Sequence, residues 1–401
     1  MTSAGSIEAP IWYPLGVEVI RTLIADDSPT ARNFLLKTLE GQDDIEVVGL
    51  AANGLEAVEM AARLRPTVIT MDLWMPELDG LAATERIMTD CPTRIVIVSS
   101  GVDSGQSPAS SAQADQRATF DALQAGALEV FPKARSTDGP ALERYRARLL
   151  STLRAMAGVT VLRRRRGVGG LYLRPVAGPA GEIREGSLPL PSRASLPPLG
   201  VPKPAPAAAA APRRFVAVGA STGGPPVLAQ LLAALPREAP PIAVVQHMAP
   251  GFTDGFLRWL RDQTGLAVKL AVGGEAAAGA TVYVAPEGLH LRLAEDWTFR
   301  LAPSAGESQF CPSVDVLFQS VAAVAGRSGI GLLLTGMGED GARGLLELRR
   351  AGGLALAQDG ESCVVNGMPA AAAELGAVER FVRPSLMPTV LASALTGPTG
   401  G

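Results

Sequence analysis

The sequence predicts an α/β protein with two parallel-sheet domains, the first of them doubly wound, joined by a linker. Its 401 residues are too many for one compact core, which indicates at least two folded units. In both halves, short β-branched runs alternate with amphipathic helical patterns, as is typical of βα units wound into a parallel sheet. Functional residues are therefore expected where strands end, at the carboxyl edge of each sheet.

The first domain is expected to span residues 17–155. Its strand-like runs are Val19–Ile24, Val47–Val48, Val68–Met71 and Ile95–Val98, with a helix beginning at Ser28. After about residue 158 the composition changes abruptly to glycine, proline, serine and alanine. Because a stretch without apolar periodicity cannot offset its ordering entropy, residues 159–212 are expected to form an extended linker.

The second domain is expected to span residues 213–396. It repeats the same theme, with strand-like runs at Phe215–Val218, Ile242–Val245, Thr281–Ala285 and Gly329–Leu334. This half is therefore also expected to contain a parallel sheet.

Composition and charge exclude several classes of protein. The 36 basic and 39 acidic residues give a net charge of -3, so there is no electrostatic reason to expect a nucleic-acid partner or an anionic membrane. No segment supplies the roughly 20 consecutive apolar residues that span a bilayer. The cysteines Cys91, Cys311 and Cys363 are widely spaced, which predicts reduced, buried thiols. We expect a cytoplasmic protein that is not inserted in a membrane.

Carboxylates follow two strand-like runs of the first half. Asp26 and Asp27 end the first run and Asp72 ends the third. In a doubly wound sheet these strand ends are neighbours, so the three carboxylates should meet in one crevice. Clustered carboxylates repel one another unless a hard cation joins them, which predicts Mg2+ as the ligand.

A hydroxyl and a cation complete this set. Ser99 follows the fourth strand-like run, and Lys133 follows Val130-Phe131-Pro132. Mg2+ and Lys133 could together neutralise the charge of a phosphoryl group on Asp72.

The pattern resembles the receiver domain of response regulators, which has a doubly wound (βα)5 fold. The resemblance implies that Asp72 accepts a phosphoryl group, that Asp26 and Asp27 hold the metal with it, and that Ser99 and Lys133 contact the phosphoryl group.

Three features depart from the usual receiver pattern. Ala134 stands where a proline commonly follows the lysine, Val130 stands where an aromatic switch residue is common, and residues 103–116 resemble an insertion. These departures concern the surface through which receivers usually act on other domains.

The second half contains a serine on a glycine-rich turn. Ser221 lies in Gly219-Ala220-Ser221-Thr222-Gly223-Gly224, directly after a strand-like run, and fits the strand-turn-helix pattern of a nucleophile. The same turn could instead bind a phosphate at a helix N-terminus. These six residues alone leave both interpretations open.

The other strand ends favour catalysis. The chain has two histidines, so the general base for Ser221 must be His247 or His290. His247 follows the next strand-like run and Asp340 follows the run at 329–334, so the three residues can converge as nucleophile, base and orienting acid. For His290 we favour a structural or substrate-facing role.

Several motifs resemble the catalytic domain of chemotaxis protein-glutamate methylesterases. They are GASTGG at 219–224, QHM at 246–248, APEGLH at 285–290, PSVDVLF at 312–318 and TGMGEDG at 335–341. The resemblance implies a triad of Ser221, His247 and Asp340, with Thr222 and the Met337 backbone amide around the oxyanion, and no cofactor in the catalytic domain.

The resemblance also implies the reaction and the partners. The substrates would be glutamate γ-methyl esters, and in many members glutamines, on the cytoplasmic helices of methyl-accepting chemoreceptors, and a histidine kinase of the chemotaxis type would be the phosphodonor. We hypothesise that the unphosphorylated receiver covers the serine crevice and that phosphorylation of Asp72 weakens this contact. A serine esterase with another substrate and a non-catalytic adaptor remain as alternatives.

Overall fold

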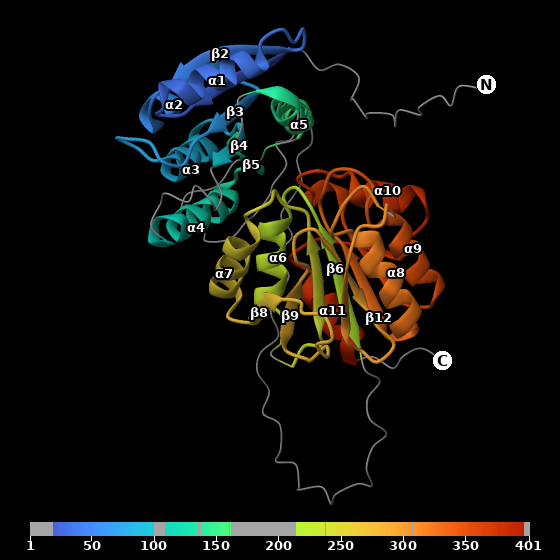
Figure 1. Ribbon diagram of the computed structural model, residues 1–401. Helices are drawn as coiled ribbons and strands as arrows, with labels where there is room; N and C mark the ends of the chain where they lie inside the picture. Colours follow the sequence, from blue (N-terminus) through green and yellow to red (C-terminus); the bar gives the residue numbers. More distant parts are fainter. Residues whose placement is uncertain are drawn as a thin grey trace, which may run out of the picture.

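The computed structural model describes residues 19–99, 109–134, 138–159, 161, 214–236, 238–306 and 308–396. These residues form two α/β units (Figure 1). Nearly all of the expected linker, 159–212, and residues 103–108 of the expected insertion lie outside the described residues.

The N-terminal unit is a doubly wound parallel sheet, as predicted, with strand order β2-β1-β3-β4-β5. Side chains of each strand point alternately to the two faces; in β1, Leu23 packs with α2 and α3, whereas Ile24 packs with α1 and α5. The elements are β1 (Ile20–Ala25), α1 (Pro29–Leu39), β2 (Ile45–Ala51), α2 (Gly54–Leu64), β3 (Val68–Met71), α3 (Gly80–Asp90), β4 (Arg94–Ser99), α4 (Ala109–Ala125), β5 (Glu129–Pro132) and α5 (Gly139–Ala157).

Local sequence explains where helices of this unit begin. The Ser28 hydroxyl accepts a hydrogen bond from the Ala31 amide at 3.3 Å, and Pro29 occupies the first turn of α1, where its missing N–H costs nothing. Asp79 caps α3 in the same way. Helix α5 continues to Ala157, slightly beyond the boundary expected at 155.

The C-terminal unit contains a seven-stranded parallel sheet with strand order β14-β13-β12-β6-β7-β9-β8. A separate antiparallel hairpin joins β10 and β11. The elements are β6 (Phe215–Ala220), α6 (Gly224–Ala233), β7 (Ile242–Gln246), α7 (Thr253–Thr264), β8 (Ala267–Leu270), β9 (Thr281–Val284), β10 (Leu289–Leu293), β11 (Phe299–Pro303), α8 (Val314–Ala325), η1 (Gly326–Ser328), β12 (Gly329–Leu333), α9 (Ala342–Arg350), β13 (Leu354–Gln358), η2 (Gly360–Ser362), α10 (Met368–Glu374), β14 (Arg380–Val382) and α11 (Met387–Thr396).

Strand β6 lies between β7 and β12 and determines which loops meet. Ala220 pairs with Gln246 of β7, and Gly219 pairs with Leu333 of β12. The residues that follow these three strands therefore adjoin at one carboxyl edge of the sheet.

The two units contact each other mainly through α4 of the first and α7 of the second, which lie side by side in Figure 1. The Phe120 ring lies 5.6 Å, centroid to centroid, from the rings of both Phe256 and Trp259. The Trp259 indole also donates a 3.1 Å hydrogen bond to the Asp121 carboxylate. This contact combines buried aromatic area with a satisfied polar group.

The described helices include none that is both long enough and apolar enough to cross a membrane. All three cysteines are unpaired. The expectation of burial holds for Cys91, whereas Cys311 and Cys363 are only half-buried because they lie in loops beside the carboxyl edge of the second sheet.

Candidate active site and phosphorylation site

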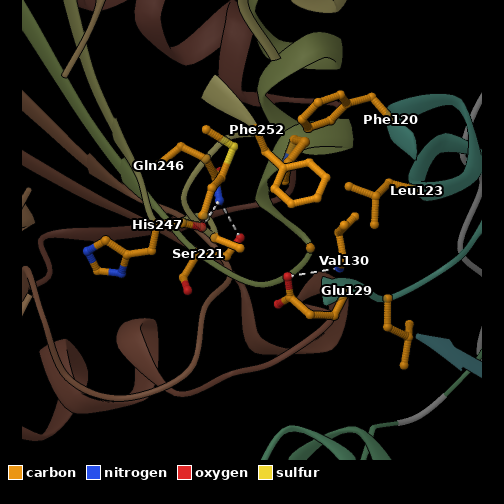
Figure 2. Close-up of a pocket in the computed structure, with 13 residues that line it drawn as sticks. Phe120, Leu123, Glu129, Val130, Ser221, Gln246, His247 and Phe252 are labelled. Atoms are coloured by element: carbon orange, nitrogen blue, oxygen red, sulfur yellow. Dashed lines mark hydrogen bonds between the residues drawn. The ribbon is translucent and has the colours of Figure 1, made fainter. Parts of the chain in front are cut away.

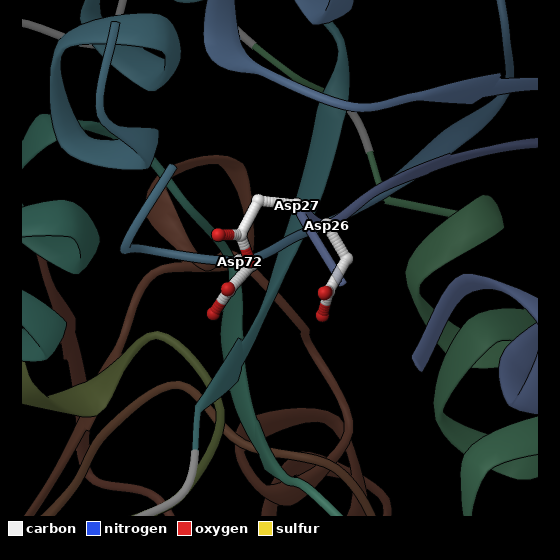
Figure 3. Close-up of side chains that lie close together, drawn as sticks. All are labelled: Asp26, Asp27 and Asp72. Carbon is white, nitrogen blue, oxygen red and sulfur yellow. The ribbon is translucent and has the colours of Figure 1, made fainter. Parts of the chain in front are cut away.

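The three predicted carboxylates meet at the carboxyl edge of the first sheet (Figure 3). Asp26 and Asp27 follow β1, Asp72 follows β3, and these two strands are paired. One oxygen from each residue lies within 4.8 Å of the others. Asp26 and Asp72 are buried whereas Asp27 is exposed, so the cluster offers hard oxygen ligands and remains open on one side. This donor set fits a hydrated Mg2+.

Lys133 joins this cluster from the end of β5. Its Nζ lies 3.0 Å from Asp26 Oδ2 and 3.1 Å from Asp72 Oδ1. The pKa of Asp72 is raised to about 6, mainly because the carboxyl is buried. The positive charge of Lys133 lowers this pKa, and the negative charge of Asp26 raises it further. Burial lowers the pKa of Lys133, but the Asp72 and Asp26 charges outweigh this effect and raise it. Ser99 is the buried last residue of β4, and its carbonyl accepts from the Lys133 amide at 2.8 Å.

Ser221 directly follows β6 and is held through its backbone. Its amide donates to the Thr335 carbonyl at 3.0 Å, and its carbonyl accepts from the Gly224 amide at 2.9 Å, at the start of α6. The buried Gln246 side chain donates from Nε2 to the carbonyls of both Ser221, at 2.8 Å, and His247, at 2.9 Å. The Gln246 side-chain amide thus links the segment that carries Ser221 to the segment that carries His247, as Figure 2 shows.

The loop after β12 approaches Ser221 closely at Gly336. A Cβ on this glycine would lie 2.7 Å from Ser221 Cβ and 2.1 Å from Met368 Sδ, so no larger residue fits without movement. The next residue, Met337, is half-buried, and its place beside the oxyanion stays a prediction.

His247 directly follows β7, and its amide donates to the Ala220 carbonyl at 2.9 Å. Its Nε2 lies 2.9 Å from Asp340 Oδ2. Both ring nitrogens are buried, and neither makes a hydrogen bond of regular geometry within the described part of the chain. The structure thus brings the three predicted residues to one edge of the sheet with the histidine and aspartate in contact, but the serine hydroxyl is not hydrogen-bonded to the imidazole.

Asp340 is fixed by the start of α8. It accepts hydrogen bonds from the Ser313 hydroxyl at 2.8 Å and from the amides of Val314 and Asp315 at 2.7 and 3.1 Å. Burial raises the pKa of Asp340, but His247 and these backbone donors outweigh it, so the pKa lies below its ordinary value. The carboxylate therefore stays charged and can orient the imidazole. Ser313 lies in the PSVDVLF motif, but the sequence alone did not identify its contact.

Both domains line a pocket at Ser221 (Figure 2). Ser221 and His247 line it from the second domain. The first domain contributes side chains from α4, from the α4–β5 turn and from β5, namely Phe120, Leu123, Leu128, Glu129 and Val130. These five residues place the first domain at the pocket that Ser221 lines.

Glu129 makes a direct polar contact across the domains. Its carboxylate accepts a hydrogen bond from the hydroxyl of Thr222, the neighbour of Ser221. Burial raises the pKa of Glu129, and the hydrogen bonds from Thr222 and the Val130 amide lower it by less. The sequence gives no signal for this contact, because the two residues are separated by 93 positions and belong to different domains.

His290, the other candidate base, is fully buried in β10. It does not line the pocket at Ser221. Of the two roles expected from the sequence, structural or substrate-facing, full burial favours the structural one.

The first domain is doubly wound and holds a carboxylate cluster with a lysine. The second is an α/β domain that brings a serine, a histidine and an aspartate to one sheet edge. Together they define a response regulator with a hydrolase-like effector domain. Residues 22–138 match the response regulator receiver domain family, and residues 216–391 match the CheB methylesterase family.

Relatives match nearly the whole chain. The chain is 40% identical over 379 residues, 94% of its length, to protein-glutamate methylesterase/protein-glutamine glutaminase 4 of Geobacter metallireducens, and it covers 99% of that protein. It is 39% identical over 376 residues to protein-glutamate methylesterase/protein-glutamine glutaminase 3 of Anaeromyxobacter dehalogenans. This match covers 93% of this chain and 98% of the relative. The CheB methylesterase catalytic domain of Thermotoga maritima is 36% identical, over 44% of this chain and 96% of that chain, with a TM-score of 0.42. The chain belongs to the protein-glutamate methylesterase/protein-glutamine glutaminase family, which confirms the resemblance inferred from the sequence.

Proposed function

We propose that this protein hydrolyses glutamate γ-methyl esters, and deamidates glutamines, on the cytoplasmic helices of methyl-accepting chemoreceptors, under control of Asp72 phosphorylation. The observation that carries the proposal is the meeting of Ser221, His247 and Asp340 at one sheet edge, with His247 Nε2 2.9 Å from a carboxylate whose pKa is lowered. The names of the relatives supply the substrate class.

In the proposed acylation step, the Ser221 hydroxyl attacks the γ-carbonyl carbon while His247 accepts the serine proton. With Nε2 2.9 Å from Asp340 Oδ2, Nδ1 is the ring nitrogen left to accept the serine proton in this proposal. Asp340 stabilises the imidazolium that results. The Met337 amide and Thr222 surround the oxyanion, and the imidazolium then protonates the leaving methoxide or amide, releasing methanol or ammonia.

In the deacylation step, water attacks the glutamyl ester of Ser221. His247 takes a proton from the water and returns it to the serine oxygen, which frees the glutamate side chain and the enzyme. Methyl esters and amides follow the same route and differ only in the leaving group.

In the receiver domain, Asp26, Asp27 and Asp72 would hold Mg2+, which would neutralise charge on the incoming phosphoryl group. A histidine kinase of the chemotaxis type would donate this group to Asp72. Lys133, already 3.1 Å from the acceptor carboxylate, would then contact a phosphoryl oxygen.

Regulation in this proposal follows from access to Ser221. Five receiver side chains line the pocket at the serine, and Glu129 engages the Thr222 hydroxyl. A receptor helix cannot reach the serine until these groups withdraw. Phosphorylation would activate the enzyme by favouring the open arrangement. The shift in the free-energy difference between the open and closed arrangements equals the difference between the interaction free energies of the phosphoryl group in the two arrangements.

Methanol release from methylated receptor tests the proposal directly. We expect Ser221→Ala to lower the rate about 1,000-fold or more, because the nucleophile is lost. Asp72→Ala should keep the unphosphorylated rate and no longer respond to acetyl phosphate.

Two results would contradict the proposal. Methanol release by Ser221→Ala at the wild-type rate would rule out the acyl-enzyme. Equal wild-type rates with and without acetyl phosphate, with Asp72 shown to be phosphorylated, would rule out control by the receiver.

A further inference from the structure

An exposed aromatic ring lies on the imidazole of His247. The Phe310 ring stacks on it with centroids 4.7 Å apart and planes 10° from parallel. Phe310 is 39% exposed and the His247 side chain only 12% exposed. The phenyl ring therefore covers one face of the imidazole, and its own outer surface faces solvent.

The segment that carries Phe310 also holds the partner of the imidazole. The Phe310 amide donates to the Ser308 hydroxyl at 3.1 Å, which forms a local turn. Three residues after Phe310, the Ser313 hydroxyl donates to Asp340 at 2.8 Å and lies at the start of α8. A single short segment thus contacts both the imidazole and the carboxylate that faces it.

Stacking restricts the orientation of a general base. Rotation about the second side-chain torsion of histidine has broad minima, so a flat neighbour restricts the plane in which the imidazole lies. The ring plane in turn determines whether Nε2 can remain beside Asp340 Oδ2, which lies 2.9 Å away.

We propose that Phe310 is a positioning residue for the reaction, holding the plane of the His247 ring so that the imidazole stays beside Asp340. This inference rests on the proposed function of His247 as the general base. It assigns a role to a loop residue outside every motif that the sequence singled out.

Two substitutions separate the stacking from simple coverage of the imidazole. Phe310→Leu keeps an apolar side chain over the ring but removes the aromatic face, whereas Phe310→Tyr keeps the face. Because Phe310 is partly exposed in a loop, neither change should disturb the fold. The buried His290 provides an internal control, since its NMR signal should not move in either variant.

The first measurement is the NMR line width of the His247 ring signals in the full-length chain. We expect these signals to broaden in Phe310→Leu, because the imidazole then exchanges between ring orientations that the stacked ring excludes. Phe310→Tyr should give the line widths of the wild type. Unchanged line widths in Phe310→Leu would overturn the proposed positioning.

The second measurement is methanol release from methylated receptor with acetyl phosphate present. Phe310→Leu should lower kcat about tenfold and leave KM unchanged, because the misaligned base acts only in the chemical step. Phe310→Tyr should restore kcat. A rise in KM alone would show that Phe310 binds substrate and would overturn the positioning role. If the wild type itself releases no methanol, the proposed function fails, and the NMR line widths still decide whether Phe310 holds the imidazole in place.

Discussion

Among single residues, Glu129 and Thr222 make the polar link between the receiver domain and the serine turn. The Glu129 carboxylate is buried against the catalytic domain, and its pKa is raised because burial outweighs the hydrogen bond from Thr222. A raised pKa means that protonation favours the closed arrangement over an open one in which Glu129 is solvated. Closure is therefore most favourable when Glu129 is neutral, although the hydrogen bond from Thr222 by itself favours the charged carboxylate.

A pH dependence of closure follows. At pH values below the ordinary pKa of glutamate, Glu129 is protonated in both arrangements and closure keeps its full strength. As the pH rises through the raised pKa of the closed form, a charged carboxylate must be buried and closure weakens. We expect the basal rate of methanol release, relative to the fully phosphorylated rate, to increase over this range.

Glu129→Gln tests this explanation. Glutamine has the same shape as glutamate, can accept a hydrogen bond from the Thr222 hydroxyl and carries no charge. The two domains of the variant should therefore close more tightly than those of the wild type at pH values above the raised pKa of Glu129. The basal rate should fall several-fold at pH values above the raised pKa of Glu129, and its ratio to the phosphorylated rate should lose its pH dependence. A higher basal rate in Glu129→Gln than in the wild type would contradict this account.

The sequence could predict those site residues that follow recognisable strands. Asp72, Ser221 and His247 each follow a β-branched run, and the carboxyl ends of parallel strands necessarily adjoin. Glu129 and Phe310 could not be found in this way. Their partners lie far away in the chain, and no local pattern records which side chain a distant segment will face.

At the scale of elements, α4 and α7 form the main contact between the domains, and Gly255 of α7 lets them approach. A Cβ at this position would lie 2.5 Å from Gln116 Cβ of α4. The Gln116 side chain also donates from Nε2 to the Gly251 carbonyl at 3.2 Å. The two helices are therefore held at a distance that only glycine allows at position 255.

Gly255→Ala should act as a wedge between α4 and α7. Alanine is favourable within a helix, so α7 itself should not be weakened, while the overlap with Gln116 should destabilise the closed arrangement. We expect a several-fold higher basal rate of methanol release and a smaller stimulation by acetyl phosphate. Gly273→Ala is the matched control, because a Cβ there meets no atom within 4 Å. Equal basal rates in both variants would exclude α4–α7 contact as the inhibitory element.

Most elements around the site were predictable from β-branched runs, including β1, β3, β4, β6, β7, β9 and β12. Strands β8, β13 and β14 and the β10–β11 hairpin were not. Strand β13 reads Leu-Ala-Leu-Ala-Gln and β14 has three residues, so neither has a strong intrinsic preference for a strand. Pairing with neighbouring strands determines their structure.

At the scale of the whole molecule, closure couples two distant sites and must act in both directions. If phosphorylation of Asp72 opens the serine pocket, any ligand that needs the open pocket must favour the phosphorylated form by the same factor. This reciprocity does not depend on the path of the coupling. It holds for any linker between the domains.

Beryllofluoride binding, as a mimic of the phosphoryl group, measures this coupling. We expect a protein whose Ser221 carries a bulky sulfonyl group to bind beryllofluoride at Asp72 about 5- to 150-fold more tightly than the unmodified protein. Ser221→Ala treated with the same sulfonyl fluoride is the control. Identical affinities in the modified and unmodified proteins would show that the two sites are independent.

Strand β5 brings the two sites close together within one short piece of backbone. Its first residue, Glu129, touches Thr222, and Lys133, directly after its last residue, lies within 3.1 Å of both Asp26 and Asp72. At about 3.3 Å per residue, these contacts are only about 13 Å apart along the strand. We therefore expect a substitution within β5 to change both the phosphorylation of Asp72 and access to Ser221, because one short strand carries a contact to each site.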